Sequence, residues 1–439
     1  MNFTQKSVVS IVLLSYFITA IDGSIVITGI AKITSDLNLP NHLVSWIQNA
    51  YILAWGGFML LGGKLSDIFG RKIILNLSLI LFGLGSLFAG LATSAHMMIS
   101  ARFLQGVGSA ILAPTSLALI IDYFEGAARI KVISWYSSIS GLGLCFGLVF
   151  GGAITNFLSW RDGFLVNIPF VLFMLFISLK VLNKGKYHKE HFDISGSLFS
   201  TFGVFSLVYA INGANNQLLW LAIAFIALTI FICIESKVNS PILPLALFKS
   251  ATRSKAYIAR ALFVGAMMGF NFMTSIYLQK KFSLSPFATG IAFLPMTVST
   301  FIAAIRVPHL IARKSNRKIL CYGLICMGLG FALLSIINAD STYLLSFMFP
   351  LFIIGIGNGL TLSPLTNLGV EGVSHKNTGS ASGLVNTSHQ IGGAIGLAIM
   401  MTLSDKTQNL TESYQISMLC ALFFIILAFI ETFIIFPNK

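Results

Sequence analysis

One carboxylate stands inside an apolar stretch that is long enough to cross a lipid bilayer. The stretch begins at Ser7, ends at Ala31 and carries Asp22 near its middle. A helix needs about 20 residues to cross the ~30 Å hydrocarbon core. A charged side chain at that depth costs roughly 2.5–3.5 kcal/mol on insertion scales, so acids in such positions usually have a function. Because Ser15, Thr19 and Asp22 share one helical face, we expect that face to line a protein interior or a watery cavity.

A basic residue is expected at the same depth. At a rise of about 1.5 Å per residue, Asp22 lies ~22 Å from the inner end of the run 8–31, and Arg102 lies about five residues from the outer end of the run 97–121. The two runs cross in opposite directions, so both side chains fall at nearly the same height. We predict that Asp22 and Arg102 form a proton-coupling pair, joined directly, through water or through Gln105. The alternative is that Arg102 extends to the outer headgroups.

The composition indicates that many helices surround this pair. The chain has 439 residues, of which 56% are hydrophobic and 10% charged, with a mean hydropathy of +0.87. These values exclude a soluble globular domain and indicate an all-α polytopic membrane protein. The apolar runs fall at about 8–31, 44–63, 73–94, 97–121, 132–155, 163–182, 194–213, 217–234, 256–278, 287–308, 318–338, 342–364, 380–403 and 415–436.

Those runs predict 14 transmembrane helices in a 6+2+6 arrangement. The expected parts are a six-helix bundle in 1–182, an inserted helix pair with flanking cytoplasmic loops in 183–255, and a second six-helix bundle in 256–439. An even number of spans places both termini on one side of the membrane. Most of the 28 Lys and Arg residues, among them Lys64 and Arg260, lie in loops and helix ends on that side, which predicts cytoplasmic termini in a bacterial-type plasma membrane.

The net charge of +14 is therefore a topology signal, and we expect no nucleic-acid partner. The five cysteines lie inside apolar runs without metal-ligand spacing, so they are interpreted as small apolar fillers. No Walker-type phosphate loop is present in the sequence. We expect no enzymatic activity, no cofactor and no bound metal; the partners expected are protons, small-molecule drugs and the lipid bilayer. The sequence is compatible with a monomer.

Polar and aromatic residues at helical spacing predict the wall of a substrate cavity. Such spacing places side chains on one helical face, and Met and aromatic surfaces tolerate varied ligands. The substrate-binding candidates are Gln48, Tyr51, Trp55, Asn271, Asn358, Asn386 and Gln390. Most of the 38 phenylalanines and 14 methionines, in contrast, are expected to face lipid or to pack between helices.

A charged turn follows the second apolar run. It reads GKLSDIFGRK from Gly63 to Lys72. Gly63 and Gly70 permit a tight turn between closely packed helices. Asp67 and Arg71 can pair with each other or with a nearby helix end, which would make a conformational latch at the cytoplasmic face. The alternative is an ordinary positively charged inner loop.

The fifth run contains glycines at four-residue spacing. Gly143, Gly147 and Gly151, followed by Gly152, let another helix approach closely. Simple helix packing explains them as well as a specialised motif does.

Several of these strings resemble motifs of the major facilitator superfamily. The turn from Gly63 is similar to motif A, Arg102 to Gly108 to motif B (RxxQGxG), and the glycines of the fifth run to antiporter motif C, although Leu148 stands where that family has proline. The string from Asp22 to Val26 and the string from Trp160 to Pro169 resemble motifs of its fourteen-span drug/proton antiporter branch, which includes the quaternary-ammonium exporters. The resemblance implies a proton-coupled multidrug efflux antiporter that works by alternating access.

Two departures from the branch bear on the substrate and on the coupling. His389 stands where the branch commonly has arginine. Histidine changes charge near neutral pH, so His389 is either a second proton site or a neutral histidine that shapes the cavity. The run 287–308 lacks the acid that some exporters of divalent cations carry, which favours amphipathic monovalent, zwitterionic or neutral substrates. The rival functions are a narrow-substrate antiporter, of the tetracycline type or for a metabolite, and a proton-independent facilitator.

Overall fold

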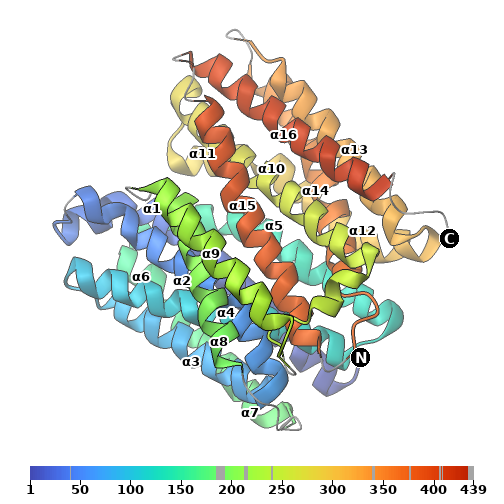
Figure 1. Ribbon diagram of the computed structural model, residues 1–439. Coiled ribbons are helices and arrows are strands. Elements are labelled where there is room, and N and C mark those ends of the chain that lie inside the picture. Colours follow the sequence, from blue (N-terminus) through green and yellow to red (C-terminus); the bar gives the residue numbers. More distant parts are fainter. Residues whose placement is uncertain are drawn as a thin grey trace. The chain divides into compact units, whose positions relative to one another are not determined.

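All regular elements of the described residues are helices (Figure 1). The computed structural model describes residues 1–39, 41–183, 193–211, 216–238, 241–338, 342–374, 377–404, 407 and 409–433. Within these residues, 12 helices are long and apolar enough to cross a membrane. The expected all-α architecture is therefore confirmed, whereas the expected number of 14 spans stays a prediction.

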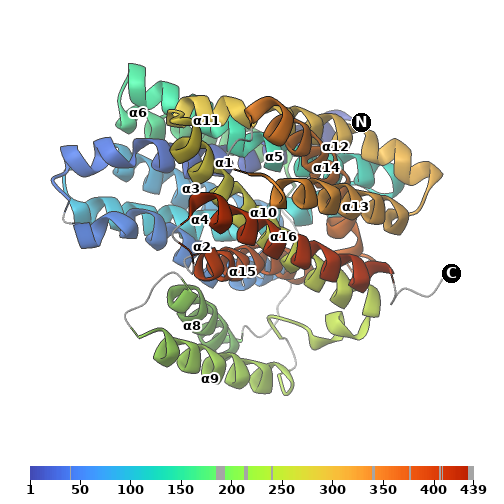
Figure 2. The same cartoon turned by 90° about the horizontal axis from the view of Figure 1, so that it is seen from above.

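The chain forms two compact units. Unit 1 comprises Met1–Glu125, Phe146–Lys249 and Gly372–Thr387. Its helices are α1 (Phe3–Asp36), α2 (Asn41–Phe69), α3 (Arg71–Gly90), α4 (Ala95–Tyr123), α6 (Trp160–Leu165), α7 (Asn167–Val181), α8 (Ile194–Ile211), α9 (Gln217–Glu235) and the 3₁₀-helix η1 (Leu245–Lys249). Within this unit α4 packs against α2 and α3, and α8 packs against both α2 and α9. Figure 2 shows α8 and α9 lying side by side as a pair.

Unit 2 comprises Gly126–Cys145, Ser250–Glu371 and Ser388–Lys439. Its helices are α10 (Ala251–Phe282), α11 (Pro286–Ala292), α12 (Leu294–Arg313), α13 (Asn316–Ser335), the π-helix η2 (Leu344–Met348), α14 (Phe349–Gly369) and α16 (Leu410–Phe433). Buried aromatic rings form part of its core, in which Tyr277 and Tyr414 have ring centroids 4.5 Å apart. Two further helices, α5 (Gly126–Phe157) and α15 (Thr378–Ser404), belong partly to each unit.

Three of the predicted runs consist of two helical pieces each. The run 163–182 corresponds to α6 and α7, the run 287–308 to α11 and α12, and the run 342–364 to η2 and α14. Pro295 and Pro350 are the second residues of α12 and α14. Proline lacks the backbone N–H that continues a helix but fits the first turn of a new one, which explains why α12 begins there. Between η2 and α14 the backbone stays helical, and only the hydrogen-bond pattern changes from π to α.

Helix ends follow local sequence signals. Asn2 caps α1 in a capping box with Gln5, and Ser94 caps α4 by accepting from the backbone N–H of Met97. These caps satisfy backbone donors that the first helical turn leaves open. Gly70, between α2 and α3, has a φ of 87°. That left-handed conformation favours glycine and explains why the turn between the two helices needs it.

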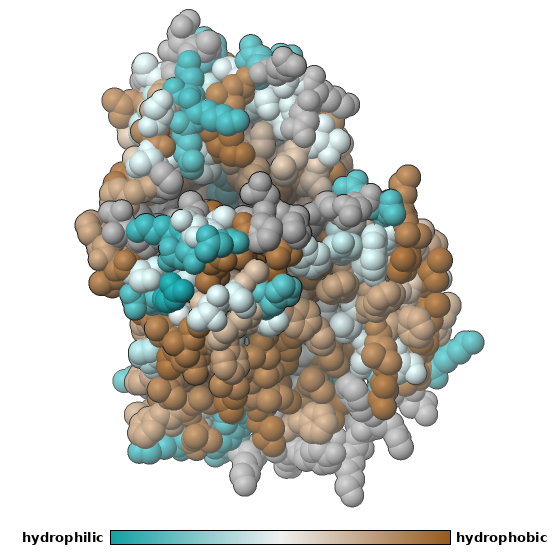
Figure 3. Space-filling model, turned by 90° about the vertical axis from the view of Figure 1, so that its left-hand side faces the viewer, coloured by the Kyte–Doolittle hydropathy of each residue, from teal (hydrophilic) through white to brown (hydrophobic). Residues whose placement is uncertain are grey.

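Large apolar side chains remain exposed on the helices. On α7 and α9 they include Leu172, Phe176, Leu218 and Phe225. Figure 3 shows a broad hydrophobic area between zones of hydrophilic side chains on one face. Exposed apolar surface of this extent indicates contact with lipid.

Candidate functional site

Asp22 and Arg102 form a buried ion pair in unit 1. Arg102 Nη1, from α4, donates to Asp22 Oδ2, from α1. Neither side chain has exposed surface. The structure thus brings together the two residues that were paired by their depth in the sequence, and the contact between them is direct.

Three polar side chains complete the surroundings of the carboxylate. Gln105 Nε2 donates to Asp22 Oδ1 at 2.9 Å, and Asn167 Nδ2 donates to the same oxygen at 3.2 Å. Ser86 Oγ accepts from both amides, at 2.7 Å and 3.3 Å respectively. Helices α3, α4 and α7 therefore all orient the carboxylate that α1 carries. The sequence analysis assigned no role to Ser86 or Asn167.

Arg102 has further contacts that do not involve Asp22. Its Nε donates to the carbonyl oxygen of Ile47 at 3.2 Å, and its Nη1 donates to Gln105 Oε1 at 2.9 Å. The guanidinium carbon lies 4.2 Å from the centroid of the Tyr51 ring, a cation–π contact. The guanidinium therefore keeps partners when the carboxylate is neutral.

Close packing of α4 fixes the position of Arg102. A Cβ on Gly106 would lie 2.7 Å from Ala54 Cβ of α2, and one on Gly108 would lie 2.6 Å from the backbone nitrogen of Phe82 of α3. Only glycine allows approaches this close. The two glycines of the RxxQGxG string thus bring α4 against its neighbours one turn after Arg102.

The surroundings of the pair suit buried charges. The ionised pair is electrically neutral, and buried charges are stable only when they are paired and hydrogen-bonded. Arg102 also contacts the Ile47 carbonyl, Gln105 and the Tyr51 ring, so its position does not depend on Asp22 alone.

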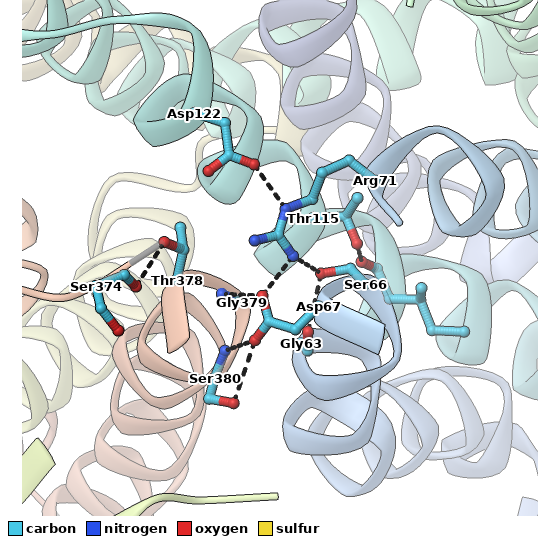
Figure 4. A network of polar contacts seen from close by, with 11 residues as sticks. Gly63, Ser66, Asp67, Arg71, Thr115, Asp122, Ser374, Thr378, Gly379 and Ser380 are labelled. Atoms are coloured by element: carbon cyan, nitrogen blue, oxygen red, sulfur yellow. Dashed lines mark hydrogen bonds and ion pairs between the residues drawn. The ribbon is translucent and has the colours of Figure 1, made fainter. Parts of the chain in front are cut away.

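The predicted latch forms a second polar network in unit 1 (Figure 4). Arg71 pairs with Asp67 (2.6 Å) and with Asp122 (2.9 Å). Asp67 also accepts from the backbone N–H groups of Gly379 (2.8 Å) and Ser380 (3.0 Å), in the first turn of α15. Asp67 therefore makes both contacts that the sequence left open, with Arg71 and with a helix N-terminus, where a carboxylate is favoured.

Gly63 lies at the closest approach of α2 to α15. A Cβ on Gly63 would overlap the carbonyl oxygen of Gly379, and a Cβ on Gly379 would overlap that of Gly63. The two helix backbones touch here, which explains why this position of the turn motif is glycine.

Asp67→Asn is expected to loosen the contact between α2 and α15. The change removes a charge-assisted bond to the helix N-terminus, worth about 1.5–3 kcal/mol, so access to a cysteine at position 380 should rise by roughly tenfold or more. The measurement is the rate of maleimide labelling of a Ser380→Cys protein whose native cysteines are replaced by alanine. Asp122→Asn is the matched control, because Asp122 contacts Arg71 while Asp67 keeps its helix contacts. Equal labelling rates with and without Asp67→Asn would contradict a latch.

Three predicted substrate residues lie on α2 beside the ion pair. Tyr51 is buried and its hydroxyl is 3.0 Å from Ser109 Oγ. Trp55 packs edge-on against Tyr51, with ring centroids 5.3 Å apart. Gln48 Oε1 and Trp55 Nε1 are buried polar atoms without a hydrogen-bond partner among the described residues. Buried polar atoms are normally paired, so these two are exceptions among the described residues.

The remaining predicted substrate and proton residues have different surroundings. In unit 1, Asn386 Nδ2 donates to the Ser382 carbonyl oxygen at 2.9 Å. In unit 2, Asn358 Nδ2 lies 3.5 Å from Thr300 Oγ1, and Asn271 Oδ1 has no partner among the described residues. Gln390 is half-buried on α15.

His389 contacts a cation that the sequence analysis assigned to an inner helix end. Arg260 Nη2 lies 3.4 Å from His389 Nδ1, and Arg260 Nη1 donates to Thr366 Oγ1 at 2.7 Å. Arg260 is only 4% exposed. A hydrogen bond from a guanidinium requires an unprotonated Nδ1, so this contact favours the neutral histidine of the two alternatives. The sequence offered one indication that Arg260 is buried: it lies nine residues after the start of α10, inside the apolar run 256–278.

Two other features lie apart from these residues. Gly147 and Gly151 are buried within α5, whereas Gly143 and Gly152 lie outside the residues whose packing is described.

A cavity of about 290 Å³ in unit 1 is lined by Trp46, Ala50, Leu53, Ile99, Ser100, Phe103 and Phe205. None of the predicted substrate residues lines it.

Sequence comparison identifies relatives over nearly the whole chain. The profile of the Major Facilitator Superfamily matches residues 12–397. A cephamycin export protein from Amycolatopsis lactamdurans is 31% identical, over 89% of this chain and 83% of its own length. A puromycin resistance protein from Streptomyces alboniger is 31% identical (90% and 80%), and a multidrug transporter protein from Bacillus subtilis is 30% identical (88% and 73%).

Solved structures share the fold at low sequence identity. A human organic anion transporter superposes with a TM-score of 0.73 at 13% identity, covering 98% of this chain and 100% of that one. A proton:xylose symporter superposes with a TM-score of 0.72 at 13% identity, covering 98% and 95%.

Proposed function

This chain belongs to the Major Facilitator Superfamily, and from that membership we propose that it is a proton-coupled antiporter that exports drugs. It is a multi-pass membrane transporter and not an enzyme, and its relatives are named for export of, or resistance to, antibiotics. Proton coupling, the direction of exchange and the identity of the drugs are the parts that we propose.

The buried pair of Asp22 and Arg102 is the observation that carries the proposal. Burying an acid and a cation inside a membrane costs free energy, so such a pair usually has a function in transport. Facing outside, Asp22 would take up a proton and weaken drug binding; facing inside, it would release the proton and favour binding. Alternating access by two helical bundles would carry the site between the two sides.

We propose that the chain has 14 spans, divided as 6+2+6. The supporting observation is that α5 and α15, with 32 and 27 residues, are long enough to cross a bilayer in addition to the twelve apolar helices. In this topology α8 and α9 are the inserted pair within 183–255, between bundles in 1–182 and 256–439. Both termini are cytoplasmic, in a bacterial-type plasma membrane.

The proposed substrates are amphipathic compounds that are monovalent, zwitterionic or neutral, as in the quaternary-ammonium and multidrug branch. Gln48, Trp55 and Asn271 would offer hydrogen bonds to them, because their buried polar atoms lack partners among the described residues. A narrow-substrate exporter is the second candidate. The cephamycin and puromycin relatives, each named for one drug, favour it.

Efflux measurements on the wild-type protein test the proposal. Cells that produce the protein should extrude ethidium and norfloxacin, and an uncoupler of the proton gradient should stop the extrusion. If neither compound moves but a single antibiotic does, the narrow-substrate reading replaces the multidrug one. Efflux that ignores the uncoupler would overturn proton coupling.

A further inference from the structure

The inserted helix pair carries two acids at its inner end that the site above does not use. Asp193 directly precedes α8, and Glu235 is the last residue of α9. Both belong to unit 1. Asp193 is 8% exposed and Glu235 is 4% exposed, so neither carboxyl group is an ordinary surface acid.

Backbone donors hold both carboxyl groups in place. Glu235 Oε1 accepts from the N–H of Ile242 at 3.2 Å, and Oε2 accepts from the N–H of Leu243 at 3.1 Å. Asp193 Oδ1 accepts from the N–H of Gly196 at 2.8 Å. Asp193 Oδ2 is buried and has no hydrogen-bond partner among the described residues. A buried acceptor is normally hydrogen-bonded, so a donor is expected at this oxygen.

The two carboxyl groups face the same small space beside Gly196. A Cβ built on Gly196 would lie 2.9 Å from Asp193 Cγ and 2.9 Å from Glu235 Oε1, with Asp193 Oδ2 nearer still. Glycine at this position therefore leaves room for two acids to approach each other. Two carboxylates this close disfavour being ionised together.

Among the described residues, Lys64 is the cation that acts on the pair. Lys64 of α2 is only 2% exposed and interacts electrostatically with Glu235. Ile242, Leu243 and Leu247 are buried, and the segment 242–247 brings backbone amides and no charged side chain to Glu235. With both acids ionised, the cluster of Asp193, Glu235 and Lys64 has a net charge of −1. One added proton makes it neutral, which is the favoured state for a buried group.

We propose that Asp193 and Glu235 bind one proton between them and form a proton site separate from Asp22. The proton is carried by one of the two carboxyl groups that border the space beside Gly196. Lys64 follows Gly63 and precedes Asp67 by three residues. The proton therefore sets the charge next to the end of α2 that carries the latch. This inference does not depend on the transport of any drug.

Infrared spectroscopy of the purified full-length protein in lipid vesicles tests the proposal directly. A protonated carboxyl group has its own C=O stretching band, which shifts in D₂O. At neutral pH, Glu235→Gln should remove one such band from the wild-type spectrum. Asp193→Asn should do the same, because the acid that remains is then balanced by Lys64 and ionises. Lys64→Met should keep the band to higher pH, because the proton is then held by two acids without a cation.

Glu412→Gln is the matched control, because Glu412 is an exposed carboxylate on α16 and should contribute no protonated band. Glu235→Gln and Asp193→Asn test the proposal independently, so if one of them misfolds the other still gives the answer. The proposal is overturned if either folded variant loses an ionised carboxylate band and leaves the protonated bands unchanged. Intact proton-driven efflux in both variants would not restore the proposal, because the proposal concerns proton binding and not drug transport.

Discussion

Asp22→Asn is expected to abolish proton-driven drug accumulation while the protein stays folded in the membrane. Asparagine has nearly the shape of a protonated aspartic acid, and the Ile47 carbonyl, Gln105 and Tyr51 continue to hold Arg102. Ethidium carries one positive charge, so its one-for-one exchange with a proton moves no net charge and is driven by the pH difference. Each pH unit supplies about 1.36 kcal/mol, which sustains a roughly tenfold drug gradient. Without a titratable group at this site, that gradient should fall to the passive distribution.

The measurement is ethidium uptake into inverted vesicles with an imposed proton gradient. Asp36→Asn is the matched control, because Asp36 lies on the same helix and is about half exposed, where it pairs with Arg161. The control should keep the full gradient. If Asp22→Asn vesicles still accumulate the dye in proportion to the proton gradient, the proton binds elsewhere.

Arg102→Met and Asp22→Asn are each expected to destabilise unit 1, by up to about 3–5 kcal/mol, because each leaves one buried charge without its partner. The Asp22→Asn/Arg102→Met double variant removes both charges. Replacing a whole buried pair is often close to neutral in stability, so the double variant should regain most of the loss. Arg102→Lys should recover less, since an ammonium cannot reproduce the guanidinium contacts with the Ile47 carbonyl, Gln105 and Tyr51.

Thermal unfolding in detergent of the wild type, Asp22→Asn, Arg102→Met, the double variant and Arg102→Lys tests these expectations. The double variant should be folded yet unable to couple efflux to protons, which separates the structural role of the pair from its role in transport. A double variant no more stable than Arg102→Met would show that Asp22 and Arg102 contribute independently of each other.

The sequence was sufficient to pair Asp22 with Arg102 because the rise of a helix is fixed. Counting residues from two helix ends gives two depths, and buried charges at one depth need each other. The same argument could not supply Ser86 and Asn167, because contact also depends on how each helix is rotated, and rotation is set by packing. The glycines that bring α4 against α2 and α3 are visible in the sequence, but their partners are not.

The surroundings of long basic side chains were harder to predict from the sequence. Arg260 was counted among the basic residues of the inner loops and helix ends, yet it contacts Thr366 and His389 inside unit 2. Lys64 belongs to a positively charged turn, yet it is buried. Long basic side chains can extend several ångströms along a helix, so their positions do not follow from depth alone.

The contacts that hold Arg102 without Asp22 have a consequence for the timing of transport. Because the Ile47 carbonyl, Gln105 and the Tyr51 ring fix the guanidinium, a change of charge at Asp22 requires no more than a local adjustment of its own carboxyl group. Local side-chain adjustments are far faster than collective helix movements, which take about microseconds to milliseconds. If Asp22 is the proton site proposed above, its protonation would precede the movement of the helices, and external acidity would change the fraction of molecules ready to turn over and not the speed of the movement itself.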